Sequence, residues 1–216
     1  MDDVLRIDDT ATRWASGDRD GRPLVVLLHG YGANEHDLFG LVPYLPEGVA
    51  VASIAAPLTP PWPMPGRSWY PIEGLTSRSP EPTTAAARAV LAWLDAAAPE
   101  APSVVLLGFS QGAAVSLQAL RLEPERFDAV VALSGYATPG DLPRDDDLRE
   151  LRPAVFWGRG THDDVIPPDL IAHTALWLPE HADLSGRVYP GLTHSISEDE
   201  LLDVRAFLDK WLERIG

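Results

Sequence analysis

The chain contains no cysteine among its 216 residues. It can therefore form no disulfide, and it has neither a thiolate nucleophile nor a cysteine ligand for a metal. Long apolar runs are also lacking, since none approaches the roughly 18 residues that a membrane-spanning helix needs. Residues 1–4 have neither the positive start nor the apolar core of a signal peptide. We therefore expect a cytoplasmic protein without stable membrane insertion.

Positive charge is scarce as well. The 17 basic residues are outnumbered by 32 acidic ones, which gives a formal net charge of −15. Such a surface repels phosphate backbones, so nucleic acid is not an expected partner. Hydrophobic residues make up 45% of the chain and charged residues 23%, which is ordinary for a globular protein. The length suits a single domain over residues 1–216.

Short apolar runs alternate with amphipathic segments along the chain. This alternation predicts an α/β fold with a mostly parallel central sheet and helices on both faces. Residues 4–7 and 12–15 are predicted to add antiparallel edge strands. The other predicted strands are 24–29, 49–55, 103–108, 129–134, 154–158 and 187–189, and the predicted helices are 35–44, 83–97, 113–122, 168–178 and 198–215.

Two intervals do not fit this alternation. Residues 57–82 carry eight of the 21 prolines, which excludes a long helix there. A loop of this length inside a compact domain usually serves function. Residues 138–152 are dominated by Asp, Arg and Leu, and we expect them to form a solvated surface segment.

The pentapeptide Gly-Phe-Ser-Gln-Gly at 108–112 follows an apolar run and precedes a segment rich in Ala and Leu. A G-x-S-x-G pentapeptide between a strand and a helix is typical of a nucleophile elbow. The flanking glycines are needed because this turn brings backbone segments into close contact and strains Ser110. Asp163 and His194 follow in the order Ser, acid, His that α/β-hydrolases use.

Four segments together resemble the phospholipase/carboxylesterase family, which includes the acyl-protein thioesterases. They are 108–112, His-Gly-Tyr-Gly at 29–32, Gly-Thr-His-Asp-Asp-Val-Ile-Pro at 160–167 and Pro-Gly-Leu-Thr-His-Ser at 190–195. The resemblance extends from about Pro23 to the C-terminus and implies an α/β-hydrolase fold. Ala113 departs from the glycine that many members carry, and its single methyl group is not expected to impair catalysis.

A serine hydroxyl needs a base, and His194 is the predicted base because it follows the last predicted strand in a loop. Asp163 is predicted to hold the other imidazole nitrogen, and the family pattern places this acid four residues before Pro167. From the residues alone, the adjacent Asp164 stays an alternative. A metal site at 162–164 is disfavoured because adjacent side chains diverge. We expect no metal and no cofactor.

The resemblance also implies an oxyanion hole formed by the backbone N–H groups of Gln111 and Tyr31. His29 is expected to pin the loop that contains Tyr31 rather than transfer protons. The proline-rich interval is rich in large apolar side chains, and the resemblance implies that it borders an acyl pocket. The predicted substrate-binding residues are Trp62, Met64, Trp69, Tyr70 and Leu75, with Trp69 the preferred wall residue.

These features predict a serine carboxylesterase that acts on small-molecule esters with small to medium acyl chains. Thioesters and lysophospholipids stay open as further substrates, and so does the oligomeric state, a homodimer included. The alternative is a hydrolase-fold protein without activity that binds a small apolar ligand. The presence of Ser110, Asp163 and His194 together favours the enzyme.

Overall fold

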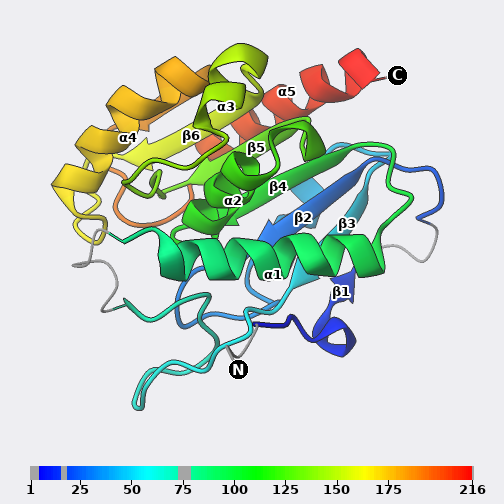
Figure 1. Cartoon of the computed structure of the whole chain (residues 1–216), viewed down its shortest axis with the longest axis horizontal. Coiled ribbons are helices and arrows are strands. Elements are labelled where there is room, and N and C mark those ends of the chain that lie inside the picture. Colours follow the sequence, from blue (N-terminus) through cyan, green and yellow to red (C-terminus); the bar gives the residue numbers. More distant parts are fainter. Residues whose placement is uncertain (1–4, 16–18, 73–78, 216) are drawn as a thin grey trace.

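A computed structural model describes residues 5–15, 19–72 and 79–215 of the chain. Its centre is a seven-stranded sheet in the order β1-β3-β2-β4-β5-β6-β7, which Figure 1 shows across the middle of the molecule. All neighbouring strands are parallel except β1, which pairs antiparallel with β3. The strands are β1 (Arg13–Trp14), β2 (Leu24–Leu28), β3 (Ala50–Ile54), β4 (Val104–Phe109), β5 (Ala129–Leu133), β6 (Ala154–Gly160) and β7 (Asp183–Tyr189).

Helices cover both faces of this sheet, as the alternation of segments predicted. Figure 1 shows α1 and α2 in front of the strands and α5 behind them. The α-helices are α1 (Glu81–Ala97), α2 (Gln111–Leu122), α3 (Asp145–Leu151), α4 (Pro168–His181) and α5 (Glu198–Ile215). Among the described residues, short 3₁₀ helices are η1 (Asp9–Ala11), η2 (Leu38–Tyr44) and η4 (Pro124–Arg126). The part of the chain that the structure describes has no helix long and apolar enough to cross a bilayer.

The core consists of two layers, one on each side of the sheet. Every residue of β2, β3 and β5 is buried, because these strands are covered on both faces. Successive side chains point to opposite faces, so Val26 packs toward α1 and α2 while Val25 packs toward α5. The continuous apolar runs of the sequence are therefore the inner strands of the sheet.

Two predictions for the N-terminal half of the chain, one of a helix and one of a strand, need correction. The predicted helix at 35–44 is the shorter 3₁₀ helix η2, since Gly40 weakens a helix and Pro43 lacks a backbone N–H. The predicted edge strand at 12–15 is present as β1. Residues 5–7 of the predicted strand at 4–7 form no strand, and residue 4 lies outside the described residues.

Residues 138–152 are mostly exposed, as their composition predicted, but the segment also contributes to the core. It contains α3, whose Leu148 is fully buried, and it supplies Asp145 to a buried ion pair with Arg121 of α2. The Arg121 guanidinium donates to both carboxylate oxygens of Asp145 and to the carbonyls of Thr138 and Gly140. Composition alone missed this contact because its two charges lie 24 residues apart in the chain.

We predict that Asp145→Ala lowers the free energy of unfolding by about 3–5 kcal/mol, because the buried Arg121 then lacks a carboxylate. Urea denaturation measures the change. Asp146→Ala on the same helix is the control, since the Asp146 side chain is 88% exposed where it pairs with Arg149. The control should cost less than about 1 kcal/mol. Equal losses in the two variants would show that the buried ion pair contributes no more to stability than the exposed one.

Candidate active site

Ser110 lies between the end of β4 and the first residue of α2, in a backbone conformation with φ 55° and ψ −115°. Residues other than glycine rarely adopt this region, and the strain commonly accompanies a functional turn. A Cβ at Gly112 would lie 2.0 Å from the carbonyl oxygen of Leu28, and one at Gly108 would lie 2.4 Å from the Gly112 oxygen. Both glycines are thus required by close backbone contact, as the pentapeptide predicted.

The structure brings the three predicted catalytic side chains into one hydrogen-bonded line. The Nε2 atom of His194 lies 2.9 Å from Ser110 Oγ, and its Nδ1 atom lies 2.8 Å from Asp163 Oδ2. Asp163 Oδ1 accepts the backbone N–H groups of Val165 and Ile166. These bonds fix the carboxylate, and the carboxylate, rather than that of Asp164, holds the imidazole.

Strand ends position both partners of Ser110. Asp163 follows β6 and His194 follows β7, so each lies at the carboxyl edge of the sheet. The loop that carries His194 crosses the end of β6 so closely that a Cβ at Gly160 would lie 1.9 Å from the Leu192 carbonyl oxygen. The Phe109 ring contacts the imidazole at a centroid distance of 5.0 Å. The imidazole is therefore confined on the side that faces β4.

The loop after β2 contains Tyr31, and it lines the same cavity as Ser110 and Gln111. Buried His29 fixes the start of this loop, since its Nδ1 atom lies 2.7 Å from the Gly30 carbonyl oxygen and its Nε2 accepts the Ala56 N–H. Nδ1 therefore carries the proton and the ring is neutral. Burial lowers the pKa of His29, in agreement with a pinning role.

The proline-rich loop is bound to the elbow by the side chain of Gln111. Its Oε1 accepts the Trp69 N–H at 2.8 Å, and its Nε2 donates to the Tyr70 carbonyl at 2.7 Å. The same loop pairs with the loop after β2, because Gly32 donates to the Arg67 carbonyl and the Arg67 N–H donates to the carbonyl of Ala33. Sequence reasoning missed this role, although a polar side chain at a buried elbow position was the available signal.

The predicted substrate-binding residues separate into different environments. Tyr70 lines the cavity. Trp69, the preferred wall residue, is fully buried in the core, and its indole Nε1 donates to the His29 carbonyl. That prediction is therefore corrected: the Trp69 side chain packs in the core, while its backbone N–H bonds to Gln111. Trp62 is 92% exposed and Met64 is 45% exposed, and neither lines the cavity. Leu75 lies outside the described residues.

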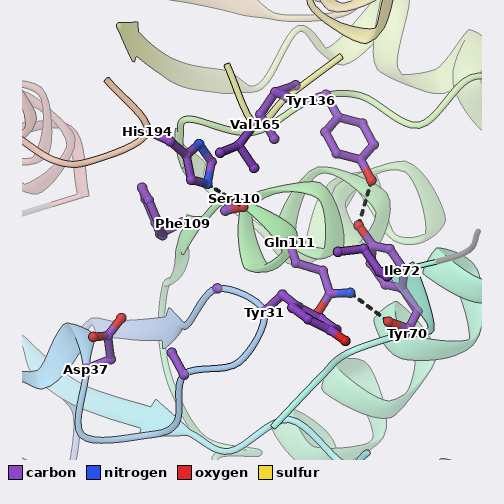
Figure 2. Close-up of a pocket in the computed structure, with 13 residues that line it drawn as sticks. Tyr31, Asp37, Tyr70, Ile72, Phe109, Ser110, Gln111, Tyr136, Val165 and His194 are labelled. Atoms are coloured by element: carbon purple, nitrogen blue, oxygen red, sulfur yellow. Dashed lines mark hydrogen bonds between the residues drawn. The ribbon is translucent and has the colours of Figure 1, made fainter. Parts of the chain in front are cut away.

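The cavity beside Ser110 has a volume of about 210 Å³. Figure 2 shows Ser110 near its centre, with His194 and Phe109 on one side and Tyr70 and Tyr136 on the other. Sequence reasoning did not select Tyr136, although it follows β5 at the carboxyl edge where ligands of parallel sheets bind. The cavity is lined by Gly30, Tyr31, Ala33, Asp37, Tyr70, Ile72, Phe109, Ser110, Gln111, Tyr136, Val165, Ile166 and His194.

Glu200 is a buried carboxyl group in the first turn of α5, six residues after His194. It is 0% exposed and presses on β6 so closely that a Cβ at Gly158 would lie 2.1 Å from its Oε1 atom. Burial raises the pKa of Glu200 to about 7; the Ser197 backbone N–H partly offsets this, and the neighbouring Asp203 adds to it. The group therefore changes charge near neutral pH, in the helix that follows the loop carrying His194.

A carboxyl whose pKa is raised on folding stabilises the fold below its unfolded pKa of 4.5, and this stability is lost as pH rises through about 7. We predict that the free energy of unfolding of the wild type falls by roughly 3 kcal/mol more between pH 4.5 and 8 than that of Glu200→Gln. Urea denaturation between pH 4.5 and 8 measures it. Glu198→Gln is the control, because Glu198 is exposed on the same helix turn. Parallel pH curves for wild type and Glu200→Gln would contradict the assignment.

The chain is similar to several known proteins. The chain is 35% identical over 117 residues to acyl-protein thioesterase 1 of Debaryomyces hansenii, covering 53% of this chain and 50% of that protein. The chain thus spans about half the length of such curated relatives. Esterase PE8 superimposes with a TM-score of 0.78 at 26% identity over 95% of this chain and 99% of that one.

Acyl-protein thioesterase 2 of Zea mays, at 20% identity, shares the fold with a TM-score of 0.77 over 95% of this chain and 99% of that one. The fold is therefore that of the α/β-hydrolases. The family model described as phospholipase/carboxylesterase matches residues 11–212, nearly the whole chain. The chain belongs to the phospholipase/carboxylesterase family.

Proposed function

We propose that the protein is a serine carboxylesterase that hydrolyses esters of small to medium acyl chains through an acyl-enzyme intermediate. The observation that carries this proposal is the hydrogen-bonded line from Ser110 through His194 to Asp163 at the edge of a cavity. A hydroxyl, an imidazole and a carboxylate in this order are the parts that acyl transfer needs.

In the first half of the reaction, Ser110 Oγ attacks the ester carbonyl while His194 Nε2 accepts the hydroxyl proton. Asp163 holds the Nδ1 proton of His194 and stabilises the imidazolium that forms. The carbonyl oxygen becomes an oxyanion, and the backbone N–H groups of Tyr31 and Gln111 are its proposed donors. The N-terminus of α2 adds a favourable dipole at that point.

Collapse of this intermediate breaks the ester bond, and His194 returns the proton to the leaving oxygen. Water then attacks the acyl group on Ser110 while His194 accepts a proton from it. When this second intermediate collapses, the bond between Ser110 Oγ and the acyl carbon breaks, His194 returns the proton to Ser110 Oγ, and the free acid leaves. A thioester follows the same steps with sulfur as the leaving atom. The names of the curated relatives support thioesters as a second substrate class.

We predict that Ser110→Ala and His194→Ala each lower kcat for p-nitrophenyl acetate by at least roughly 10⁴, and that the double variant is hardly slower. The losses do not multiply because the two side chains act as one unit. Initial-rate kinetics at pH 8 measures all three variants. Losses that multiply would refute the assignment, and binding of the ester without turnover by the wild type would favour the inactive alternative.

Asp163→Asn should lower kcat by about 10⁴, because the amide stabilises the wrong imidazole tautomer. Asp164→Asn is its matched control, since the two side chains are adjacent and only Asp163 bonds to His194. The control should keep most of the activity. The reverse ranking would transfer the orienting role to Asp164.

The hydrogen bonds between the Gln111 side chain and the proline-rich loop, called the Gln111 clamp below, lead to a separate prediction. Gln111→Leu should lower kcat/KM for the acetate ester by roughly 10- to 100-fold, because the loop that supports the oxyanion donors loses its hydrogen bonds to the Gln111 side chain. Gln118→Leu is the control, as Gln118 is buried on the same helix and bonds to Thr84 and Arg121 instead.

The control should lower the melting temperature but change kcat/KM by less than about threefold. If both variants lose activity in proportion to their stability, Gln111 acts only as a packing residue and the clamp has no catalytic part.

A further inference from the structure

The cavity has two ends that differ in chemistry. Figure 2 shows His194 and Phe109 on one side of Ser110, and Tyr70, Ile72 and Tyr136 on the opposite side beyond Gln111. The proposed mechanism decides which part of an ester lies at each end. His194 must protonate the leaving oxygen, so the leaving group lies on its side. The acyl chain therefore points away from His194, toward the two tyrosines.

A bond between two tyrosine hydroxyls crosses this acyl end. The Oη atoms of Tyr70 and Tyr136 lie 2.7 Å apart, and the two residues are 3% and 4% exposed. They come from two different loops on this side of the cavity, Tyr136 from the loop after β5 and Tyr70 from the proline-rich loop (Figure 2). The surrounding wall is otherwise apolar at this end, with Ile72 and Ile166. The hydroxyl pair is thus a polar group at the end of an apolar channel.

Two hydroxyls that share one hydrogen bond carry two protons, and only one of these protons lies between the two oxygens. Either hydroxyl can be the donor of this bond. Burial raises the pKa of both hydroxyls, that of Tyr136 to about 12, so both keep their protons at neutral pH. Where Tyr70 donates to Tyr136, the O–H of Tyr136 is available to a ligand.

We propose that Tyr136 determines specificity by donating a hydrogen bond to an oxygen atom on the acyl chain. The preferred substrates are then esters of short oxygenated acids, with an ether, hydroxyl or keto oxygen, rather than plain alkanoate esters. A purely apolar acyl chain leaves the buried O–H of Tyr136 without an acceptor, so binding of plain alkanoate esters is disfavoured. This inference rests on the proposed esterase function and names the substrate class of that site.

The test compares matched p-nitrophenyl esters in which one chain methylene is replaced by an ether oxygen, for acyl chains of four to eight atoms. The acetate ester, which has no chain to carry an ether oxygen, reports the basic activity. Wild type should prefer the oxygenated ester by about tenfold in kcat/KM at one or two adjacent positions of the oxygen. Tyr136→Phe should abolish this preference, which is measured as the ratio of kcat/KM for the two esters of a matched pair.

Tyr189→Phe is the matched control, because the Tyr189 hydroxyl bonds to Asp203 away from the cavity. It should keep the wild-type preference. Tyr70→Phe is a second variant, which removes the hydroxyl that orients the Tyr136 proton. It should reduce the preference for oxygenated esters, while the preferred position of the oxygen in the acyl chain stays the same.

Acetate turnover without any preference for oxygenated chains would overturn the inference while the esterase function stands. A preference that survives in both Tyr136→Phe and Tyr70→Phe would also overturn it. Failure of the wild type to hydrolyse any of the esters would instead refute the proposed function itself. Loss of acetate activity in Tyr136→Phe with normal folding would show that Tyr136 acts on the reacting centre, which contradicts its assignment to the acyl end.

Discussion

The contact of Gly112 with the end of β2 is the constraint on which the rest of the site depends. Because the Leu28 carbonyl leaves no room for a side chain there, α2 begins directly against β2 and Ser110 is confined to a strained turn. The same contact sets the loop after β2 beside the first turn of α2. The serine and both proposed oxyanion donors are therefore fixed relative to each other by backbone packing, before any substrate binds.

The proline-rich loop has a structural part in this arrangement that its composition does not indicate. Through Arg67 it pairs with the loop after β2, and through Gln111 it is bound to the elbow. Prolines limit the conformations of the unbound loop, so fewer are lost when it is held in place. Trp69 anchors it in the core, and Tyr70, the next residue, reaches the cavity. One segment thus supports the oxyanion loop and supplies a cavity wall.

The elements predicted well were those determined by local patterns. Buried parallel strands appear as continuous apolar runs, and the elbow needs glycines at fixed spacing, so β2 and Ser110 could be located from the sequence. Contacts between distant segments could not. Nothing near Trp69 in the sequence shows that its backbone N–H bonds to Gln111, and nothing near Asp145 shows that Arg121 faces it. Tyr136 was missed for the same reason, since its partner Tyr70 lies 66 residues away.

The strained elbow presents Ser110 toward the cavity, and we propose that His194 activates it as a nucleophile. Reaction with a fluorophosphonate tests this activation, because the reagent forms a covalent bond with an activated serine. Peptide mapping by mass spectrometry should find one adduct per chain, on the peptide that contains Ser110, and His194→Ala should slow its formation by several orders of magnitude. An adduct on another residue, or labelling at the same rate without His194, would contradict the account.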